Sequence, residues 1–247
     1  MSGSDQHLVA APGSDAQPRI ELFDDWEHSL RPATTGETRV PLPESPPFRP
    51  LLRRPMALLH IVDDGRDDGE KVRMRGDRLV IGRSEGEVIV PHDISMSPRH
   101  AGIERLADAA WELSDLGSSS GTFVRVTSAR LKDGGMFRLG GTVLQFHAVD
   151  VTEAWLVDVT LAGRGHRHEC HAPTTTVGRV GSGCGVCLHD PFVSPLHAEV
   201  HRTSRGWRID NAGASGLWVR IDAPVRMMAP SQFLCGEQRF VFEPLTS

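Results

Sequence analysis

The side chains with the clearest chemistry in this chain are arginines, serines and histidines that occur twice at matching spacing. The repeated set is a Gly-Arg pair, a Ser-Pro-x-His-Ala segment and a Ser-Gly-x-aromatic-Val-Arg segment, found at Gly82-Arg83, 97–101 and 120–125, and again at Gly178-Arg179, 194–198 and 215–220. A guanidinium and hydroxyl groups on glycine-rich turns, with no acid–base pair beside them, are typical of an oxyanion-binding site. The sequence therefore favours anion binding over catalysis.

The charge distribution separates a tail from the two repeats. The 247 residues carry 27 basic and 32 acidic side chains, a net charge of −5, which gives no support for binding to a nucleic-acid backbone. Residues 1–50 hold four basic and eight acidic side chains, residues 51–147 hold fourteen of each, and residues 155–247 hold nine and eight. The excess of acid therefore lies in the tail.

Residues 1–50 are expected to form a disordered, Pro-rich acidic tail. They contain clustered prolines, few β-branched residues and no sustained period, so they cannot bury enough apolar surface to offset the loss of chain entropy. No apolar run approaches the ~20 residues of a membrane-spanning helix, and the polar N-terminus lacks the basic and apolar parts of a signal peptide. We therefore expect a cytoplasmic protein without a membrane partner.

The rest of the chain is predicted to be all-β. Short alternating or apolar runs are separated by Gly, Asp and Ser turns, and no window keeps a helical period over three turns. In the first repeat the expected strands cover 56–62, 70–75, 78–82, 87–90, 100–105, 110–115, 122–125 and 142–147. We predict two consecutive β-sandwiches, over 55–148 and 155–245. The joint at 149–154 is too short for a free linker, so a fixed mutual pose of the sandwiches is expected.

The order of these motifs resembles the forkhead-associated (FHA) domain, in the tandem arrangement of bacterial proteins. Gly-Arg is followed by Ser-x-x-His-Ala, by Asp-Leu-Gly-Ser-Ser-x-Gly-Thr-Phe-Val at 115–124, and by a Leu-x-x-Gly turn into Leu-Gly. The resemblance covers about 55–148 with an intact motif and 155–245 with a degenerate one. It implies β-sandwiches whose loops at one end bind phosphothreonine peptides.

The resemblance assigns a phosphopeptide site to the first repeat. Arg83 is the expected clamp, because a planar guanidinium can hold two phosphate oxygens at once. Ser97 and Ser119 would each donate a hydroxyl to the phosphate. Ser120 stands where the family usually has an asparagine that fixes the peptide backbone, and a serine makes one such bond where an amide makes two. Pro98 replaces a residue that is commonly Arg or Asn, which removes one more polar contact.

His100 admits two interpretations. It lies near Ser97 and Asp115 in the sequence, so a catalytic base is one of them. The resemblance implies the other, a buried, hydrogen-bonded histidine that braces the loop, and it gives His197 the same supporting role. We favour the supporting role. An enzyme is not expected, because the sequence has no glycine-rich Walker loop, metal-ligand set or nucleophile elbow.

The second repeat lacks part of this site. When Gly216 is aligned with Gly121, Ala214 stands opposite Ser119, so one phosphate-facing hydroxyl is missing. A structural or protein-binding role is therefore the preferred interpretation of this repeat. The residues that remain as a candidate second site for an anion are Arg179, Ser194 and Ser215.

The four cysteines raise a zinc hypothesis. Cys184 and Cys187 form a C-x-x-C, and other side chains of ligand type lie nearby in the sequence at His168, Cys170, His171 and His189. The repeat alignment argues against zinc, because it places three of the four cysteines opposite apolar residues that should face a core. These pairs are Cys170 with Met74, Cys187 with Val90 and Cys235 with Leu139. We expect no metal and no cofactor, and free thiols agree with a reducing compartment.

Two functions of different class remain open. The first is a non-catalytic adaptor in Ser/Thr kinase signalling that binds a phosphothreonine-containing protein, or the kinase itself, through the first repeat. The second is a phosphorylation-independent scaffold in which both repeats bind partners through sheet faces. Neither involves nucleic acid. The loop that holds Ile94, Ser95 and Met96 is expected to set the residue preferred after the phosphothreonine.

The tail contains candidate phosphorylation sites at Thr34, Thr35 and Thr38. Several bacterial FHA regulators that this chain resembles carry a threonine pair in such a tail, and the phosphorylated tail binds its own FHA pocket. The resemblance thus implies autoinhibition. Thr35 and Met56 are 21 residues apart, and a flexible chain of that length has an r.m.s. span of roughly 25 Å, comparable to the size of one sandwich.

Overall fold

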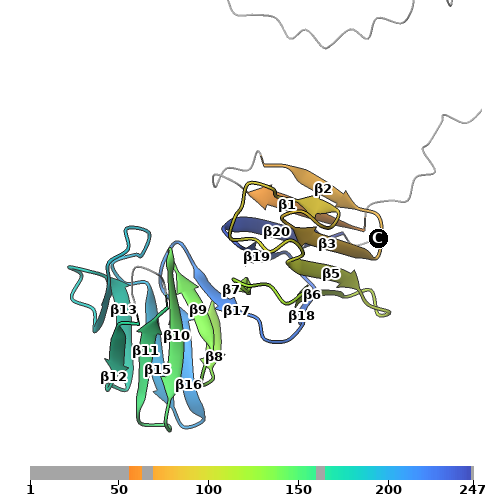
Figure 1. Cartoon of the computed structure of the whole chain (residues 1–247). Coiled ribbons are helices and arrows are strands. Elements are labelled where there is room, and N and C mark those ends of the chain that lie inside the picture. The colour runs from red at the N-terminus through yellow and green to blue at the C-terminus, as the bar shows by residue number, and fades with distance from the viewer. Residues whose placement is uncertain (1–55, 63–68, 160–164, 246–247) are drawn as a thin grey trace, which may run out of the picture. The chain divides into compact units, whose positions relative to one another are not determined.

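The computed structural model describes residues 56–62, 69–159 and 165–245. The regular elements within these ranges are all β-strands, so the predicted all-β fold class is confirmed (Figure 1). The tail of residues 1–50, with Thr34, Thr35 and Thr38, lies outside the described residues. Its disorder and its phosphorylation therefore stay predictions.

The first sequence repeat contributes ten strands. They are β1 (Ala57–Val62), β2 (Lys71–Met74), β3 (Arg78–Gly82), β4 (Val88–Ile89), β5 (Ala101–Arg105), β6 (Trp111–Asp115), β7 (Thr122–Val126), β8 (Ser128–Leu131), β9 (Met136–Leu139) and β10 (Thr142–Ala148). Eight of them match the predicted runs to within one residue at each end. β8 and β9 are additional, since both are short and β8 alternates exposed with half-buried residues, which leaves no strong apolar period.

The second sequence repeat contributes ten more strands. They are β11 (Ala154–Asp158), β12 (Arg167–Cys170), β13 (Thr174–Arg179), β14 (Val186–Leu188), β15 (Ala198–Thr203), β16 (Gly206–Asn211), β17 (Leu217–Arg220), β18 (Val225–Met227), β19 (Ser231–Cys235) and β20 (Gln238–Pro244). Each is the counterpart of the strand ten places earlier. For example, Ala57 pairs with Met74 across β1 and β2, and Ala154 pairs with Cys170 across β11 and β12.

The described strands form three sheets. A ten-stranded sheet has the order β12-β11-β10-β9-β17-β7-β19-β20-β1-β2. The order is symmetric about its centre: strands at equal distances from the two ends are counterparts, such as β12 with β2 and β17 with β7. The two five-stranded sheets have the orders β14-β13-β15-β16-β8 and β18-β6-β5-β3-β4.

The C-terminal strands are exchanged between the two repeats. β8 pairs with β16 of the second repeat, and β18 pairs with β6 of the first. In the same way β9 pairs with β17 and β19 with β7, while β10 pairs with β11 and β20 with β1. At the centre of the ten-stranded sheet β7 and β17 run antiparallel, and the counterpart residues Val124 and Val219 lie opposite each other.

Each hydrophobic core consequently contains residues of both repeats. The first core joins residues of β1 to β6 with Phe233, Phe240 and Phe242, and the ring of Trp111 meets that of Phe242 edge-on at a centroid distance of 5.4 Å. Burial of these aromatic rings supplies much of the apolar area that holds the first core together. Strands β18 to β20 are therefore required by the core that contains β1 to β6.

The second core is nearly continuous in sequence. It draws on residues 126–219, whereas the first draws on 56–124 and 221–242. Phe146 of β10 packs 6.0 Å from Trp207 of β16, measured between ring centroids. The boundaries 55–148 and 155–245 thus describe the sequence repeats, while the cores divide the chain at other places.

A short connection explains the exchange. β10 and β11 are joined by residues 149–153 and pair as a hairpin, with Ala148 opposite Ala154. Asp150 shapes the loop, because one of its oxygens accepts bonds from the backbone N–H groups of Thr152 and Glu153 at 2.6 and 2.9 Å. β1 and β11 are counterparts, and either could pair with β10. The neighbouring strand closes the smaller loop and so costs less chain entropy, which leaves β1 to pair with β20.

A pair of engineered cysteines tests the exchange. Ser128 of β8 lies opposite Asp210 of β16, and its hydroxyl donates to that carboxylate at 2.5 Å. Directly opposed antiparallel residues have Cα separations of about 4.5–5.5 Å, which suit a disulfide. We expect Ser128→Cys with Asp210→Cys to form an intramolecular disulfide on oxidation, detected by mass spectrometry of proteolytic fragments.

The matched control places the second cysteine in the first repeat. Val225 pairs with Leu113, so Ser114 is the residue that Ser128 would oppose if the first repeat kept its own β8. Ser128→Cys with Ser114→Cys should stay reduced. A disulfide in this control, and none in the Ser128/Asp210 pair, would show that each repeat keeps its own strands.

Candidate functional site

The first repeat brings its predicted site residues onto three adjoining loops, which we call the first site: Arg83, Ser97, Ser119 and Ser120. Arg83 follows β3, and its backbone N–H donates to the carbonyl of Ser97 at 2.9 Å. Gly82 is required here, because a Cβ at this position would lie 2.1 Å from the carbonyl oxygen of Pro98. The close approach of the two loops thus sets Arg83 beside Ser97.

The two serine hydroxyls of the first site lie together. The Oγ of Ser97 accepts a bond from the backbone N–H of Ser119 at 3.0 Å, and the two Oγ atoms are 3.2 Å apart. The hydroxyl of Ser120 turns away and donates to the carbonyl of Ser95 at 2.9 Å. Ser97 and Ser119 therefore present a pair of hydroxyls to solvent, while Ser120 ties two loops together.

The loop that carries Ser119 is held by Asp115, the first residue of the motif at 115–124, for which no supporting role was predicted. Asp115 accepts bonds from the backbone N–H groups of Gly117 and Ser118 at 2.9 and 2.8 Å, and from the hydroxyls of Ser118 and Thr122 at 2.6 and 2.7 Å. Burial would raise the pKa of Asp115, but these hydrogen bonds outweigh it and hold the pKa below its ordinary value. The Asp-x-Gly-Ser sequence, typical of a side-chain-capped turn, is the signal that could have identified it.

His100 braces the first site from inside and is fully buried. Its Nδ1 accepts from the backbone N–H of Ser97 at 3.1 Å, and its Nε2 lies 3.1 Å from the carbonyl oxygen of Gly121. Since a carbonyl can only accept, the proton sits on Nε2, and the neutral ring satisfies both neighbours. This geometry matches the supporting role and leaves His100 no lone pair for a catalytic base.

Protonation of His100 should destabilise the first site. Burial lowers the pKa of His100, and this effect outweighs the opposing bond to Gly121 and the nearby charges of Asp115 and Asp93. An unfolded histidine has a pKa of about 6.5, so below that pH the unfolded chain binds the proton more readily than the fold does. Stability is therefore expected to be greatest above about pH 6.5 and to fall as the pH decreases below it.

Urea unfolding at pH 7.5 and pH 5.5 measures this dependence. His100→Gln removes the titrating group but keeps a donor and an acceptor, so its stability should change less between the two pH values than that of the parent. Imidazole nitrogen spectra should show the Nε2–H tautomer of His100 at pH 7.5. An equal pH dependence in parent and variant would contradict the assignment.

The second repeat reproduces the backbone frame, with the second site defined as Arg179, Ser194, Ala214 and Ser215. The N–H of Arg179 donates to the carbonyl of Ser194 at 3.0 Å, and the N–H of Ala214 donates to the Oγ of Ser194 at 3.3 Å. His197 contacts Ser194 and Gly216 as His100 contacts Ser97 and Gly121. The backbone frame is therefore intact. The N–H of Ala214 makes the bond that the N–H of Ser119 makes in the first site, but Ala214 has no hydroxyl.

The support of the second loop is weaker. Asn211 takes the place of Asp115, since it pairs with Ala198 as Asp115 pairs with Ala101. Its Nδ2 donates to the carbonyl of Gly213 at 3.0 Å, and its Oδ1 is buried without a hydrogen-bond partner among the described residues. One bond thus replaces the four that Asp115 accepts, which agrees with a site that has lost part of its ligand chemistry.

Both sites are also braced by strands exchanged from the other repeat. Asp93, just before the first-site loop, accepts from the N–H groups of Glu237 and Gln238 at 2.8 and 3.2 Å. Asp190, its counterpart, accepts from the N–H of Gly141 at 2.7 Å and from the hydroxyl of Thr142 at 2.9 Å. Each loop is therefore held against a turn of the other repeat.

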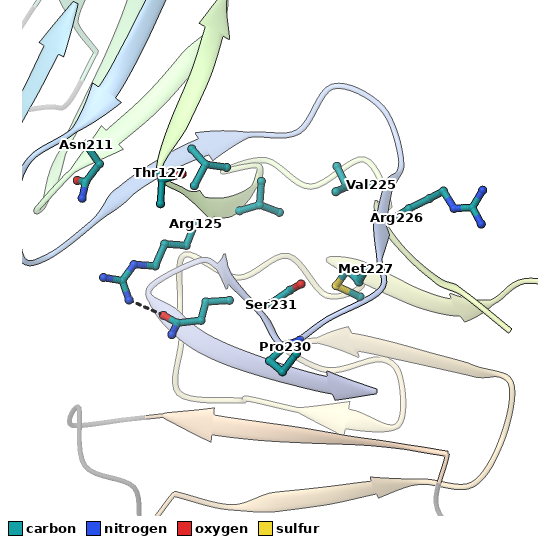
Figure 2. A pocket seen from close by; sticks show the side chains of 11 residues that line it. Arg125, Thr127, Asn211, Val225, Arg226, Met227, Pro230 and Ser231 are labelled. Carbon is teal, nitrogen blue, oxygen red and sulfur yellow. Dashed lines mark hydrogen bonds between the residues drawn. The ribbon is translucent and has the colours of Figure 1, made fainter. Parts of the chain in front are cut away.

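Arg125 makes a similar link near the second site. Its guanidinium lies 5.9 Å from the ring centroid of Trp218 and donates to the carbonyl of Ala214 at 3.4 Å. It also donates to the side chain of Gln232 at 3.0 Å, the dashed line in Figure 2. Gly216 is required beside it, because its φ is +86° and a Cβ would lie 2.5 Å from the Nε of Arg125. A residue of the first repeat thus fixes a loop of the second.

Figure 2 shows a groove whose lining includes Arg125 and Asn211, which donate hydrogen bonds to the carbonyl groups of Ala214 and Gly213 on the second-site loop. It has a volume of about 410 Å³ and an open, mixed polar and apolar lining that includes Val225, Met227 and Pro230. None of the predicted phosphate-binding residues lines it. The first-site residues lie on loops between strands, with Arg83 directly after β3.

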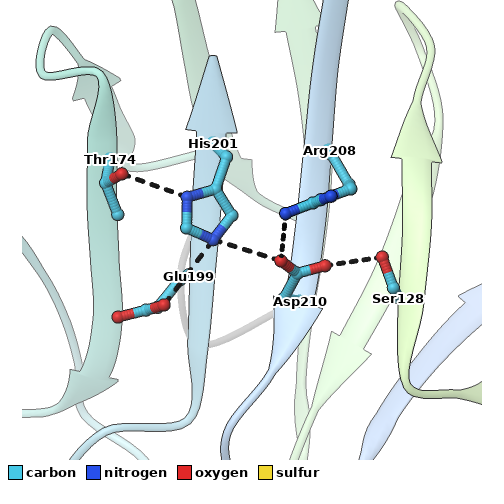
Figure 3. Close-up of polar contacts among 6 residues, drawn as sticks. All are labelled: Ser128, Thr174, Glu199, His201, Arg208 and Asp210. Atoms are coloured by element: carbon cyan, nitrogen blue, oxygen red, sulfur yellow. Dashed lines mark hydrogen bonds and ion pairs between the residues drawn. The ribbon is translucent and has the colours of Figure 1, made fainter. Parts of the chain in front are cut away.

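A polar cluster lies on the sheet that contains β8 and β13 to β16 (Figure 3). The Nδ1 of His201 is 3.0 Å from the hydroxyl of Thr174, and its Nε2 is 3.2 Å from Asp210. Arg208 and Ser128 contact the same carboxylate at 2.7 and 2.5 Å. Asp210 is paired with His201, Arg208 and Ser128. We therefore interpret the cluster as a structural link between β8 and the second repeat.

The cysteine positions agree in part with expectation. Cys170 and Cys235 are buried in the two cores, where burial raises the pKa of the Cys170 thiol to about 11. The alignment of Cys187 with Val90 was wrong, because Gly178 pairs with Cys187 as Gly82 pairs with Ile89. Cys187 is accordingly only half-buried, and its counterpart Ile89 is exposed, so neither residue belongs to a core. Among the described residues, no group of three or more His, Cys, Asp and Glu side chains could hold a metal ion.

Comparison with known proteins supports the sequence repeat. The sequence model of the FHA domain matches residues 79–140 and 175–230. The FHA domain-containing proteins FhaB of Mycolicibacterium smegmatis and of Mycobacterium tuberculosis are 31% identical to this chain over 97 residues, which make up 38% of this chain and 62% of each relative. The alignment therefore spans about three fifths of the length of these curated relatives.

Two solved structures are also similar. The FHA domain of the CT664 protein from Chlamydia trachomatis aligns with 77% of this chain and 98% of that chain, at 12% identity and a TM-score of 0.36. Mycobacterium tuberculosis EmbR, in complex with a low affinity phosphopeptide, aligns with 39% of this chain and 25% of that chain, at 21% identity and a TM-score of 0.24. The two regions that the FHA domain model matches together cover 118 of the 247 residues.

Proposed function

Because the chain is a tandem FHA domain protein, we propose that it is a phosphothreonine-binding adaptor in Ser/Thr kinase signalling, with the first site as the reader. FHA domain proteins are typically non-catalytic interaction modules, and the proposal includes no reaction. It includes a cytoplasmic location. Among the described residues, no helix is long and apolar enough to cross a membrane.

One observation supports the proposal most strongly. The hydroxyls of Ser97 and Ser119 lie 3.2 Å apart on two loops, and the backbone of Arg83 is bonded to one of these loops. The guanidinium of Arg83 makes no hydrogen bond or ion pair with another described residue, so it is free to meet an anion. A phosphate with close to two negative charges suits this combination of one guanidinium and two hydroxyls.

The alternative is a phosphorylation-independent scaffold. It is favoured at the second site alone, because Ala214 has no hydroxyl and Asn211 holds the loop by one bond. Screening a phosphothreonine peptide library against dephosphorylated copies of the same peptides separates the two functions. Binding that survives dephosphorylation would support the scaffold.

Arg83→Ala should abolish most phosphopeptide binding. Charge-assisted hydrogen bonds contribute about 1.5–3 kcal/mol, so we expect Kd to rise at least tenfold in calorimetric titration with the best peptide of the library. The residue is not part of either core, so unfolding by urea should be unchanged.

Arg179→Ala is the matched control, since it makes the same substitution at the same place in the second repeat. We expect it to change Kd much less, because the second site lacks the hydroxyl of Ser119. Equal losses from the two substitutions would contradict the assignment of the first site as the reader. Unchanged binding in Arg83→Ala would show that the site is misplaced.

The proposal includes a switch in the tail. A flexible tether of the 21 residues between Thr35 and Met56 has an r.m.s. span of roughly 25 Å, comparable to the size of one sandwich, and gives an effective concentration of about a millimolar. We expect phosphorylation of the chain by a Ser/Thr kinase to shift the amide signals of Arg83, Ser97 and Ser119. The Thr34→Ala, Thr35→Ala double variant should show no such shifts. A phosphorylated tail that leaves the affinity for external peptide unchanged would refute autoinhibition.

A further inference from the structure

The second repeat places an arginine beside the first site. Arg220 ends β17, which pairs with β7 directly after the loop that carries Ser119 and Ser120. Gly121 is the next residue of that loop, and a Cβ added to it would lie 2.5 Å from the Nε and 3.1 Å from the Cζ of Arg220. The guanidinium of Arg220 therefore lies against the backbone of the loop that holds Ser119.

The equivalent arginine at the second site is hydrogen-bonded within the chain. Arg125 lies against Gly216, and its guanidinium donates to the carbonyl of Ala214 at 3.4 Å. It also donates to the side-chain oxygen of Gln232 at 3.0 Å, the dashed line in Figure 2. Both acceptors are amide oxygens, each with two lone pairs. The charge of Arg125 is therefore matched by acceptors of the protein itself.

A methionine takes the place of Gln232 at the first site. Met136 precedes Phe137 on β9 as Gln232 precedes Phe233 on β19, and the two phenylalanines face equivalent valines of the central strands. Arg220 donates to the Sδ of Met136 at 3.4 Å, and it makes no other hydrogen bond or ion pair with a described residue. Because a thioether is only a weak acceptor, most of the donors of Arg220 remain without a partner.

The burial of Arg220 makes this shortage of acceptors costly. Arg220 is half-buried, whereas Arg125 is exposed, and donors withdrawn from water need acceptors to offset the loss of hydration. The planar fork of a guanidinium fits a carboxylate, which can accept two parallel bonds from it. A carboxylate supplied by the ligand would therefore satisfy Arg220.

We propose that Arg220 selects an acidic residue in the phosphothreonine peptide, an inference that rests on the proposed function of the first site. The Cα atoms of Ser119 and Gly121 are at most about 7 Å apart, and the Cζ of Arg220 lies within about 5 Å of the Cα of Gly121. An extended peptide advances about 3.4 Å per residue. The preferred ligand thus carries Asp or Glu within about four residues of the phosphothreonine.

Calorimetric titration of the full-length chain with matched peptides tests the contact. The probes are the best peptide of the phosphothreonine library and the same peptide with its Asp and Glu residues changed to Asn and Gln. In the parent this change should raise Kd about fivefold, the size expected of a partly exposed ion pair. In Arg220→Met, which removes the charge and keeps an unbranched side chain, the two peptides should bind equally.

Two further variants serve as controls. Arg125→Met makes the same substitution beside the second site, and it should keep the fivefold difference between the peptides. Met136→Gln offers Arg220 the acceptor that Gln232 offers Arg125, so it should reduce the difference to about twofold without removing the charge. This variant also covers the case in which Arg220→Met does not fold.

Three outcomes would overturn the proposal. A library that selects no acidic residue near the phosphothreonine, or a fivefold difference that persists in Arg220→Met or in Met136→Gln, would refute acidic selection and leave the adaptor function in place. Equal weakening of both peptides in Arg220→Met, with their difference kept, would assign Arg220 to the phosphate. A parent chain that binds no phosphopeptide would refute the adaptor function, and the selection of an acidic residue would fail with it.

Discussion

The antiparallel pairing of β10 with β11 is the interaction on which the rest of the structure depends. A loop of five residues joins these strands and makes them a hairpin, so β10 is not available to β1. β1 must then pair with β20, and the strands attached to β10 and β20 follow them into the opposite cores. One short connection thus converts two repeats in tandem into two cores that each need both repeats.

This exchange reaches the candidate sites through a few buried polar contacts. Asp93 and Asp190 hold the loops of their own repeat against the β19–β20 and β9–β10 turns of the other. The buried carboxylates satisfy backbone N–H groups that would otherwise be costly to bury. The shape of each site is therefore a property of the whole described chain, although the groups that would contact the phosphate at the first site all come from the first repeat.

The sequence allowed the strands and the site loops to be predicted, because both depend on local patterns. Alternating apolar residues located eight strands of the first repeat, and the spacing of Arg83, Ser97 and Ser119 placed them on adjoining loops. The exchange could not be predicted, since β1 and β11 carry equivalent patterns and only the cost of loop closure favours one partner over the other. The Cys187 alignment failed for a related reason, because a shift of one residue reverses which side of a strand faces the core.

A comparison of the two repeats separates positions that serve the fold from positions that serve a ligand. The buried bracing groups are mostly kept, since His100 with His197 and Asp93 with Asp190 are identical, whereas Asp115 is replaced by Asn211. Groups that face solvent carry no such constraint. The two sites therefore share one backbone frame and differ in a solvent-facing group, the hydroxyl that Ser119 carries and Ala214 lacks.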